Sequence, residues 1–212
     1  MGLPCYIEIL EISKYLLKNR LWWLGSFALV FLIGSYLLQI LSKEDSLISD
    51  YHRFDAPKAL TQFNLVDQHL NEINPGDFKG RWSLVFFGFT HCPDICPTTM
   101  SALNSVVEDL PSPPTVVMVT ADPERDSPQV LKQYLFAFNE SFKGLSGTSD
   151  NLNLLARQLG FAFRRIPGAV LGTYSVEHTN SIAVINPRAE YAGFFEITNE
   201  PRDILRIIQS FH

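Results

Sequence analysis

The sequence has few cysteines and no excess of basic residues. Three of its 212 residues are cysteine, and Asp and Glu outnumber Lys and Arg by 22 to 17, which gives a net charge of -5. A chain with this charge lacks the basic surface that attracts phosphates, so we expect no nucleic-acid partner. Internal repeats and low-complexity stretches are also missing from the sequence. The length leaves room for one ordinary domain and an appendage.

Charge is absent from one long apolar run, residues 21–41 (LWWLGSFALVFLIGSYLLQIL). As a helix this run would be about 30 Å long, which matches the hydrocarbon core of a bilayer. Trp22, Trp23 and Tyr36 suit the aromatic belts at the membrane interfaces. We therefore predict a single transmembrane helix over this run rather than a buried helix of a protein core.

The flanking charges orient this helix. Lys14, Lys18 and Arg20 precede it, whereas a mixture of Lys, Glu and Asp follows it. The positive-inside rule then leaves the N-terminal end in the cytoplasm and exports everything after the helix. The expected organisation is a cytoplasmic tail over 1–20, a transmembrane signal-anchor helix over 21–41, a linker over 42–60 and an exported domain over 61–212.

Alternative targeting signals are missing from the sequence. No small-x-small cleavage site follows the apolar run, and no cysteine stands there to carry a lipid anchor. Glu8 and Glu11 give the N-terminal tail an acidic character that mitochondrial transit peptides avoid. We therefore expect an uncleaved anchor in a bacterial inner membrane, with the C-terminal domain in the periplasm.

The three cysteines divide between the two sides of this membrane. Cys5 lies in the tail, whereas Cys92 and Cys96 form the single pair in the exported part. Exported thiols tend to be oxidised. A pair that works as free thiols there needs a reductant, which we expect to be of the thioredoxin type.

The exported part alternates strand and helix patterns. Residues 161–176, with their proline and glycines, read as an irregular loop or loose hairpin that leads into His178. The resulting β-α-β-α-α-β-β-α order, with cysteines at the end of the first central strand, describes a thioredoxin-like α/β domain. The expected strands are 82–90, 115–120, 180–186 and 190–197, and the expected helices are 98–110, 129–138, 150–159 and 201–211.

Cys92 and Cys96 enclose three residues in the run CPDIC, at the junction of the first expected strand and helix. Residues four apart lie on one helical face, so a helical turn here would bring both sulfurs to one site. The partial positive charge at the start of a helix lowers the pKa of a thiol. The pair could form a structural disulfide, cycle as a redox disulfide or hold a metal. Thioredoxin-type redox motifs place two residues between the cysteines, not three.

Three motifs in this order resemble the signatures of the Sco/SenC family. They are GFTHCPDICPTTM at 88–100, TADPERDSP at 120–128 and YSVEHTNSIAVINP at 174–187. Members of that family are membrane-tethered copper proteins that assist the assembly of cytochrome c oxidase. The resemblance covers residues 50–212 and extends to the single N-terminal anchor. The family more usually has Asp-His-Ser in the last motif, where this chain has Glu177, His178 and Thr179.

The resemblance implies a thioredoxin fold that binds one copper ion, Cu(I) or Cu(II), through Cys92, Cys96 and His178. Two thiolates and one imidazole are a donor set that suits Cu(I) and tolerates Cu(II). The implied function is that of a periplasmic copper chaperone, a metallochaperone rather than an enzyme. It would receive copper from a periplasmic donor and deliver it to the dinuclear copper site of cytochrome c oxidase subunit II.

Other interpretations of the same residues stay open. His91 as a fourth ligand would complete a set that suits tetrahedral zinc. A thiol-disulfide oxidoreductase would use Cys92 and Cys96 as its redox-active pair, and a thioredoxin-like peroxidase is a third possibility. The charged turn over 122–126 provides capping and local ion pairs, or else a docking surface or support for the metal site. The remaining histidines, which we expect to face solvent, are His52, His69 and His212.

Overall fold

The computed structural model describes residues 29, 31–36, 51–197 and 200–211. The chain divides into two compact units, Met1–Leu47 and Ile48–His212. In the first unit the described residues are helical. None of the helices among the described residues is long and apolar enough to cross a membrane. Most of the predicted span 21–41, the whole tail 1–20 and residues 42–50 of the predicted linker lie outside the described residues.

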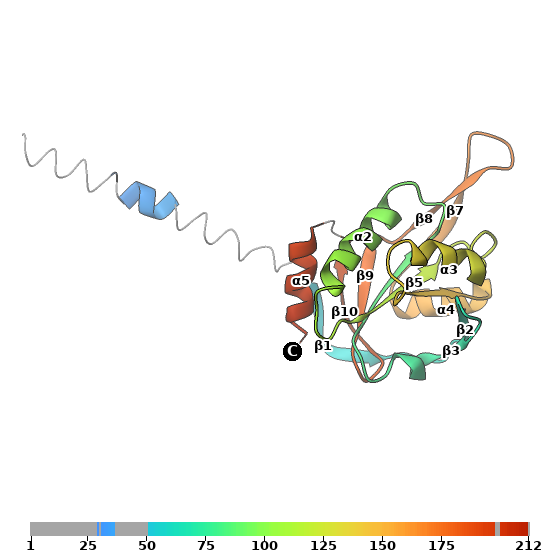
Figure 1. The fold of residues 1–212 in the computed structure, drawn as a ribbon, viewed down its shortest axis with the longest axis horizontal. Coiled ribbons are helices and arrows are strands. Elements are labelled where there is room, and N and C mark those ends of the chain that lie inside the picture. Colours follow the sequence, from blue (N-terminus) through green and yellow to red (C-terminus); the bar gives the residue numbers. More distant parts are fainter. Residues whose placement is uncertain (1–28, 30, 37–50, 198–199, 212) are drawn as a thin grey trace, which may run out of the picture. The chain divides into compact units, whose positions relative to one another are not determined.

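The second unit is built on an eight-stranded mixed sheet with the order β1-β10-β9-β4-β5-β6-β2-β3 (Figure 1). At its centre β4 runs parallel to β5, and β5 runs parallel to β6, whereas β9 is antiparallel to β4. A second sheet consists of the hairpin β7–β8 alone. The strands are β1 Tyr51–Ala59, β2 Leu65–Asp67, β3 Glu72–Ile73, β4 Ser83–Gly88, β5 Thr115–Thr120, β6 Lys143–Ser146, β7 Phe163–Pro167, β8 Tyr174–His178, β9 Ser181–Ile185 and β10 Glu190–Glu196.

Helices cover both faces of the sheet, which explains why β4 is a continuous apolar run. Every residue of β4 is buried, as expected for a central strand between two layers of helices. Alternate side chains enter the two cores: Leu84 and Phe86 pack with α2, α3 and α5, whereas Val85 and Phe87 pack with α4. The helices are α2 Ile95–Val107, α3 Pro128–Phe136, α4 Ser149–Gln158 and α5 Pro201–Gln209, with a 3-10 helix η2 at Pro75–Phe78.

Part of the predicted linker is an edge strand. Residues 51–59 form β1, which pairs antiparallel with β10, for example Lys58 with Tyr191. Most of its side chains are exposed or half-buried. An edge strand that covers little of the core can carry many polar and charged residues, so its sequence reads like a linker. The main sheet therefore begins within the segment that we expected to be a linker.

The predicted helices and central strands are confirmed, with shifted ends. The strand over 115–120 is β5, residue for residue. The four-residue strand β6, between α3 and α4, was not expected from the sequence. The segment expected to be a loop or loose hairpin contains the regular hairpin β7–β8. The N-cap of α3 is Ser127, and that of α4 is Thr148.

Asp67, at the end of β2, fixes the turn to β3. Its carboxylate accepts hydrogen bonds from the backbone N–H of His69 at 2.7 Å and of Asn71 at 2.9 Å. The side-chain amide of Asn71 donates a third at 2.9 Å. Burial alone would raise the pKa of Asp67, but the bonds from Asn71 and His69 outweigh it and leave the pKa below its ordinary value.

We expect Asp67→Asn to lower the free energy of unfolding by about 1–3 kcal/mol at neutral pH, because an amide replaces a charged acceptor of three hydrogen bonds. A carboxylate with a lowered pKa stabilises the fold above its unfolded pKa of about 3.9, and this contribution is lost as the pH falls through the folded value. Urea unfolding of the full chain in detergent should therefore show a difference at neutral pH that shrinks below about pH 4. Asp109→Asn, at an exposed carboxylate after α2, is the control. An equal effect at both pH values would contradict this assignment.

Candidate metal centre

The candidate site lies where β4 ends and α2 begins. Cys92 stands in the connecting loop, and its N–H donates to the Phe89 carbonyl at 3.1 Å. Cys96 is the second residue of α2, whose N-cap is Asp94. Cys92 therefore lies before the helix, and one helical turn does not carry both cysteines. The Cys92 thiol still lies at the start of the helix, where the Cys96 N–H donates to the Cys92 Sγ at 3.5 Å.

His178 reaches this site from the hairpin. It is the last residue of β8, and its Nε2 lies 3.8 Å from the Cys96 Sγ, across 82 residues of sequence. Its Nδ1 lies 3.1 Å from the Thr179 carbonyl oxygen. Since a carbonyl oxygen only accepts, this contact assigns the proton to Nδ1 and leaves the Nε2 lone pair free towards the sulfur.

The distance between these two atoms fits a shared ion. Bonds of about 2.3 Å to sulfur and 2.0 Å to nitrogen, at an angle of about 120°, place the two donors about 3.7 Å apart. Cys92 and Cys96 are free thiols and share a buried cluster with Phe89, Ala121 and Val176. In the part of the chain that the structure describes, no group of three or more His, Cys, Asp or Glu side chains is already arranged as a metal site. A bound ion would therefore require the donors to adjust. The assignment of Cys92, Cys96 and His178 as ligands stays a prediction.

Burial favours the neutral forms of Cys96 and His178. It raises the pKa of the Cys96 thiol far above its ordinary value, and the neighbouring Cys92 and Asp126 act in the same direction. Burial also lowers the pKa of His178, against the opposing hydrogen bond to Thr179. The expectation that the helix start lowers the thiol pKa is therefore wrong for Cys96. A metal ion that binds Cys96 as thiolate must displace its proton, so binding releases protons.

The walls of the site are apolar and closely packed. The Phe89 ring stands edge-on to the His178 ring, with centroids 6.1 Å apart. Gly88 ends β4 directly beneath the thiol, and a Cβ at this position would lie 3.1 Å from the Cys96 Sγ. A glycine here lets the sulfur rest against the strand. On the solvent side, an open pocket is lined by His178 together with Phe163 and Arg164.

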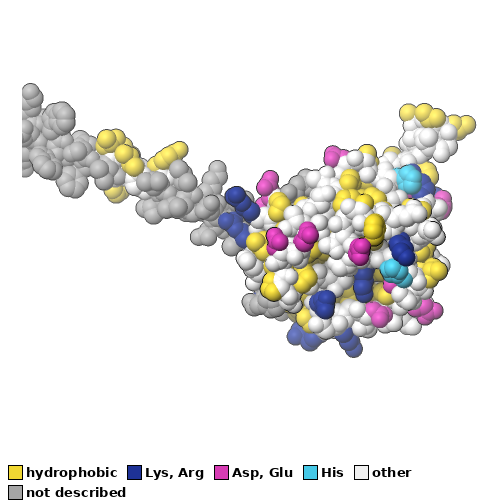
Figure 2. Space-filling view, in the orientation of Figure 1, with side chains coloured by type: hydrophobic (Ala, Val, Ile, Leu, Met, Phe, Trp, Pro, Cys, Tyr) yellow, Lys and Arg dark blue, Asp and Glu magenta, His cyan; other side chains and the backbone are white. Residues whose placement is uncertain are grey.

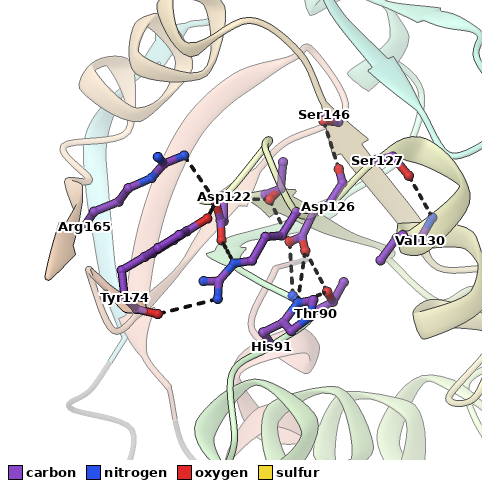
Figure 3. A network of polar contacts seen from close by, with 11 residues as sticks. Thr90, His91, Asp122, Asp126, Ser127, Val130, Ser146, Arg165 and Tyr174 are labelled. Carbon is purple, nitrogen blue, oxygen red and sulfur yellow. Dashed lines mark hydrogen bonds and ion pairs between the residues drawn. The ribbon is translucent and has the colours of Figure 1, made fainter. Parts of the chain in front are cut away.

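The other candidate side chains lie elsewhere. His91 is 56% exposed, and its Nδ1 lies 3.0 Å from the Thr90 Oγ1 and 4.0 Å from the Asp126 Oδ1 (Figure 3). Neither of these contacts involves a cysteine, so they give no support to His91 as the fourth ligand of a zinc ion. His52 and His69 are exposed, as expected, and His212 lies outside the described residues.

Asp126, in the charged turn, supports the cysteine loop. Its buried carboxylate accepts hydrogen bonds from the Thr90 N–H at 3.0 Å and the Thr90 hydroxyl at 2.6 Å. The Thr120 hydroxyl donates a third bond at 2.8 Å. Asp126 thus ties the end of β5 to Thr90, which follows β4 and stands two residues before Cys92. The sequence showed an acidic turn, but its burial and its partner 36 residues away came only from the fold.

Comparison with known proteins points to one family. The family model SCO1/SenC matches residues 53–212. A SCO2-like protein of Rickettsia felis is 30% identical over 178 residues, which cover 82% of this chain and 87% of that protein. The solution structure of apo Sco1 from Thermus thermophilus has a TM-score of 0.68 and 31% identity, and covers 76% of this chain and 95% of its own.

A crystal structure of yeast Sco1 with copper bound is also similar, with a TM-score of 0.65 and 29% identity. The match covers 73% of this chain and 88% of the yeast chain. These likenesses confirm the thioredoxin-like α/β fold. The family match spans well over half of the sequence, so this chain belongs to the SCO1/SenC family.

Proposed function

We propose that this chain is a membrane-anchored periplasmic copper chaperone that delivers copper to the dinuclear site of cytochrome c oxidase subunit II. The observation that carries the proposal is the approach of the His178 Nε2 to 3.8 Å from the Cys96 Sγ, beside the buried Cys92 thiol. The related yeast protein, solved with copper bound, supports copper as the metal.

The donor chemistry suits copper as a transferable cargo. Two thiolates and an imidazole prefer Cu(I) and tolerate Cu(II). His178 enters as the neutral imidazole that ligation requires, because its pKa is lowered by burial. Three protein ligands leave a coordination position open, so an incoming cysteine of the recipient can displace them one at a time. The open pocket beside His178 offers an approach for such a group.

The cellular setting of this proposal rests on the sequence. The apolar run 21–41 would anchor the chain, and the charges around it would place the domain in the periplasm. There the chaperone would take copper from a periplasmic donor. A thioredoxin-type reductant would keep Cys92 and Cys96 as thiols, since a disulfide cannot ligate the ion.

A copper titration of the reduced full chain in detergent tests the proposal. We expect one copper ion per chain and, with Cu(II), a thiolate charge-transfer band in the visible spectrum. His178→Ala should weaken binding at least about tenfold, because the loss of a ligand exceeds the loss of an outer-shell partner. His91→Ala, at the histidine next to Cys92, is the matched control and should leave affinity unchanged. Substoichiometric binding, or equal affinity of wild type and His178→Ala, would overturn the three-ligand site.

A second candidate is a thiol-disulfide oxidoreductase that reduces exported cysteines of the oxidase or of another target. The observation that favours it is the free Cys92–Cys96 pair, with the Cys92 Sγ next to the backbone N–H at the start of α2. Dithiol exchange needs no imidazole ligand. An insulin-reduction assay in which His178→Ala keeps its activity while copper binding is lost would separate the two roles.

A further inference from the structure

We infer that Asp122, Arg125, Arg165 and Tyr174 form a clamp that holds the hairpin β7–β8 where His178 can meet Cys96. This hairpin clamp consists of positioning residues that act through His178. The inference rests on the proposed copper function for its main readout. It adds to that function a reason why His178 occupies its place in the fold.

Asp122 is the centre of the clamp. It lies two residues after β5 and is completely buried. Its carboxylate accepts a hydrogen bond from the Tyr174 hydroxyl at 3.0 Å and lies 3.4 Å from the Arg165 Nη2 (Figure 3). Arg125 donates to the same carboxylate through Nε. Because Arg165 stands on β7 and Tyr174 on β8, one carboxylate ties both strands of the hairpin to the end of β5.

Arg125 extends the clamp towards the metal site. Its guanidinium lies 4.0 Å from the centroid of the Tyr174 ring and 5.8 Å from that of Phe89. Its Nη1 also donates to the Tyr174 carbonyl at 3.5 Å. Phe89 in turn contacts the His178 ring edge-on. Packed contacts therefore run from Asp122 through Arg125 and Phe89 to the imidazole.

The hairpin depends on such contacts because it forms a sheet separate from the main one. Its two strands pair only with each other among the described strands, and an isolated two-stranded hairpin is marginally stable. It projects from the body of the domain (Figure 1), and Figure 2 shows hydrophobic side chains at its projecting end. Val170 and Leu171 in its turn are exposed. Its inner side is held by Val176 in the buried cluster of the site.

The clamp supplies the strongest polar attachment of this hairpin. Hydrogen bonds and ion pairs between charged groups are stronger than hydrogen bonds between neutral groups. Arg165 also pairs with the exposed Glu124 at 2.7 Å, whereas the pair of Arg164 with Glu177 joins the two strands of the hairpin to each other on the surface. Weakening the clamp would let His178 move away while the cysteines stay in place. A three-donor site would then become a two-donor site.

Tyr174→Phe is the sharpest test, because it removes one hydroxyl and keeps the ring against which both guanidinium groups lie. We expect the variant to weaken copper binding about 5- to 20-fold, near the lower end of the usual effect of outer-shell partners. In a His178→Ala background the same change should have no further effect, since the clamp acts through the imidazole. Ser175→Ala, which removes an exposed hydroxyl from the same strand as Tyr174, is the matched control and should change affinity less than about twofold.

Two outcomes of this double-mutant cycle overturn the clamp. One is unchanged copper affinity in Tyr174→Phe, and the other is an equal loss with and without His178. If wild type binds no copper, the proposed function fails, and the metal-free protein still tests the clamp. Hydrogen exchange of the Arg164 and Glu177 amides, which pair across the hairpin, should then be faster in Tyr174→Phe than in Ser175→Ala. Equal exchange in the two variants would refute the clamp by itself.

Discussion

Replacement of Cys96 by serine is expected to abolish tight copper binding, with a loss of affinity of more than about 100-fold. A hydroxyl is a harder donor that stays protonated at neutral pH, whereas copper prefers a soft thiolate, and the loss of a ligand exceeds the usual 10- to 100-fold effect of outer-shell changes. Cys96 also lies at the centre of the site, because its sulfur contacts the imidazole and packs against Gly88. Competition with a chromophoric Cu(I) chelator under reducing conditions measures the effect.

Cys5→Ser is the control for this experiment, because it removes the third cysteine of the same chain. It should keep one copper ion per chain with wild-type affinity. Cys92→Ser should resemble Cys96→Ser. If Cys96→Ser kept wild-type affinity, copper would bind outside the buried cluster and the proposed site would be wrong.

Phe86→Ala is expected to lower the free energy of unfolding by about 3–5 kcal/mol, which is the usual effect of deleting a buried aromatic ring. Phe86 is completely buried in the middle of β4, in the core that also contains Met100 and Leu103 of α2. The cavity would therefore lie beneath the helix that carries Cys96. Urea unfolding followed by circular dichroism measures the change.

Phe136→Ala, at the end of α3, is the matched control. This ring is 67% exposed, so its removal should change the free energy of unfolding by less than about 0.5 kcal/mol. Equal effects of the two substitutions would contradict the packing described for β4.

Much of the central fold could be predicted from the sequence, because burial on both faces of the sheet determines which residues its central strands contain. A strand covered on both faces must be apolar throughout, and β4 shows this pattern directly before the cysteines. The start of a helix can be recognised from a capping residue and a proline, as with Ser127 and Pro128 at the start of α3. Elements at the rim are harder to recognise. β1 faces solvent with charged residues, and β6 has only four residues, so neither has a periodic pattern long enough to recognise.

The sequence by itself determined the donor types. The CPDIC run, the later motif around His178 and the family relationship name the three candidate ligands without any coordinates. The donor atom of a side chain depends only on the residue type, so a cysteine offers sulfur and a histidine offers nitrogen wherever they lie in the fold. The same local information led to one wrong expectation, a lowered thiol pKa at the helix start.

Only the tertiary structure decided how these donors meet. The 3.8 Å between Cys96 and His178 bridges 82 residues, and the burial that raises the pKa of Cys96 comes from neighbours on several elements. The hairpin clamp depends in the same way on Asp122, which contacts Tyr174 across 52 residues. Distance and desolvation depend on packing between distant segments. For that reason the candidate ligands could be identified from the sequence. The pKa shifts of Cys96 and His178, and the contacts that hold the His178 hairpin in place, could not.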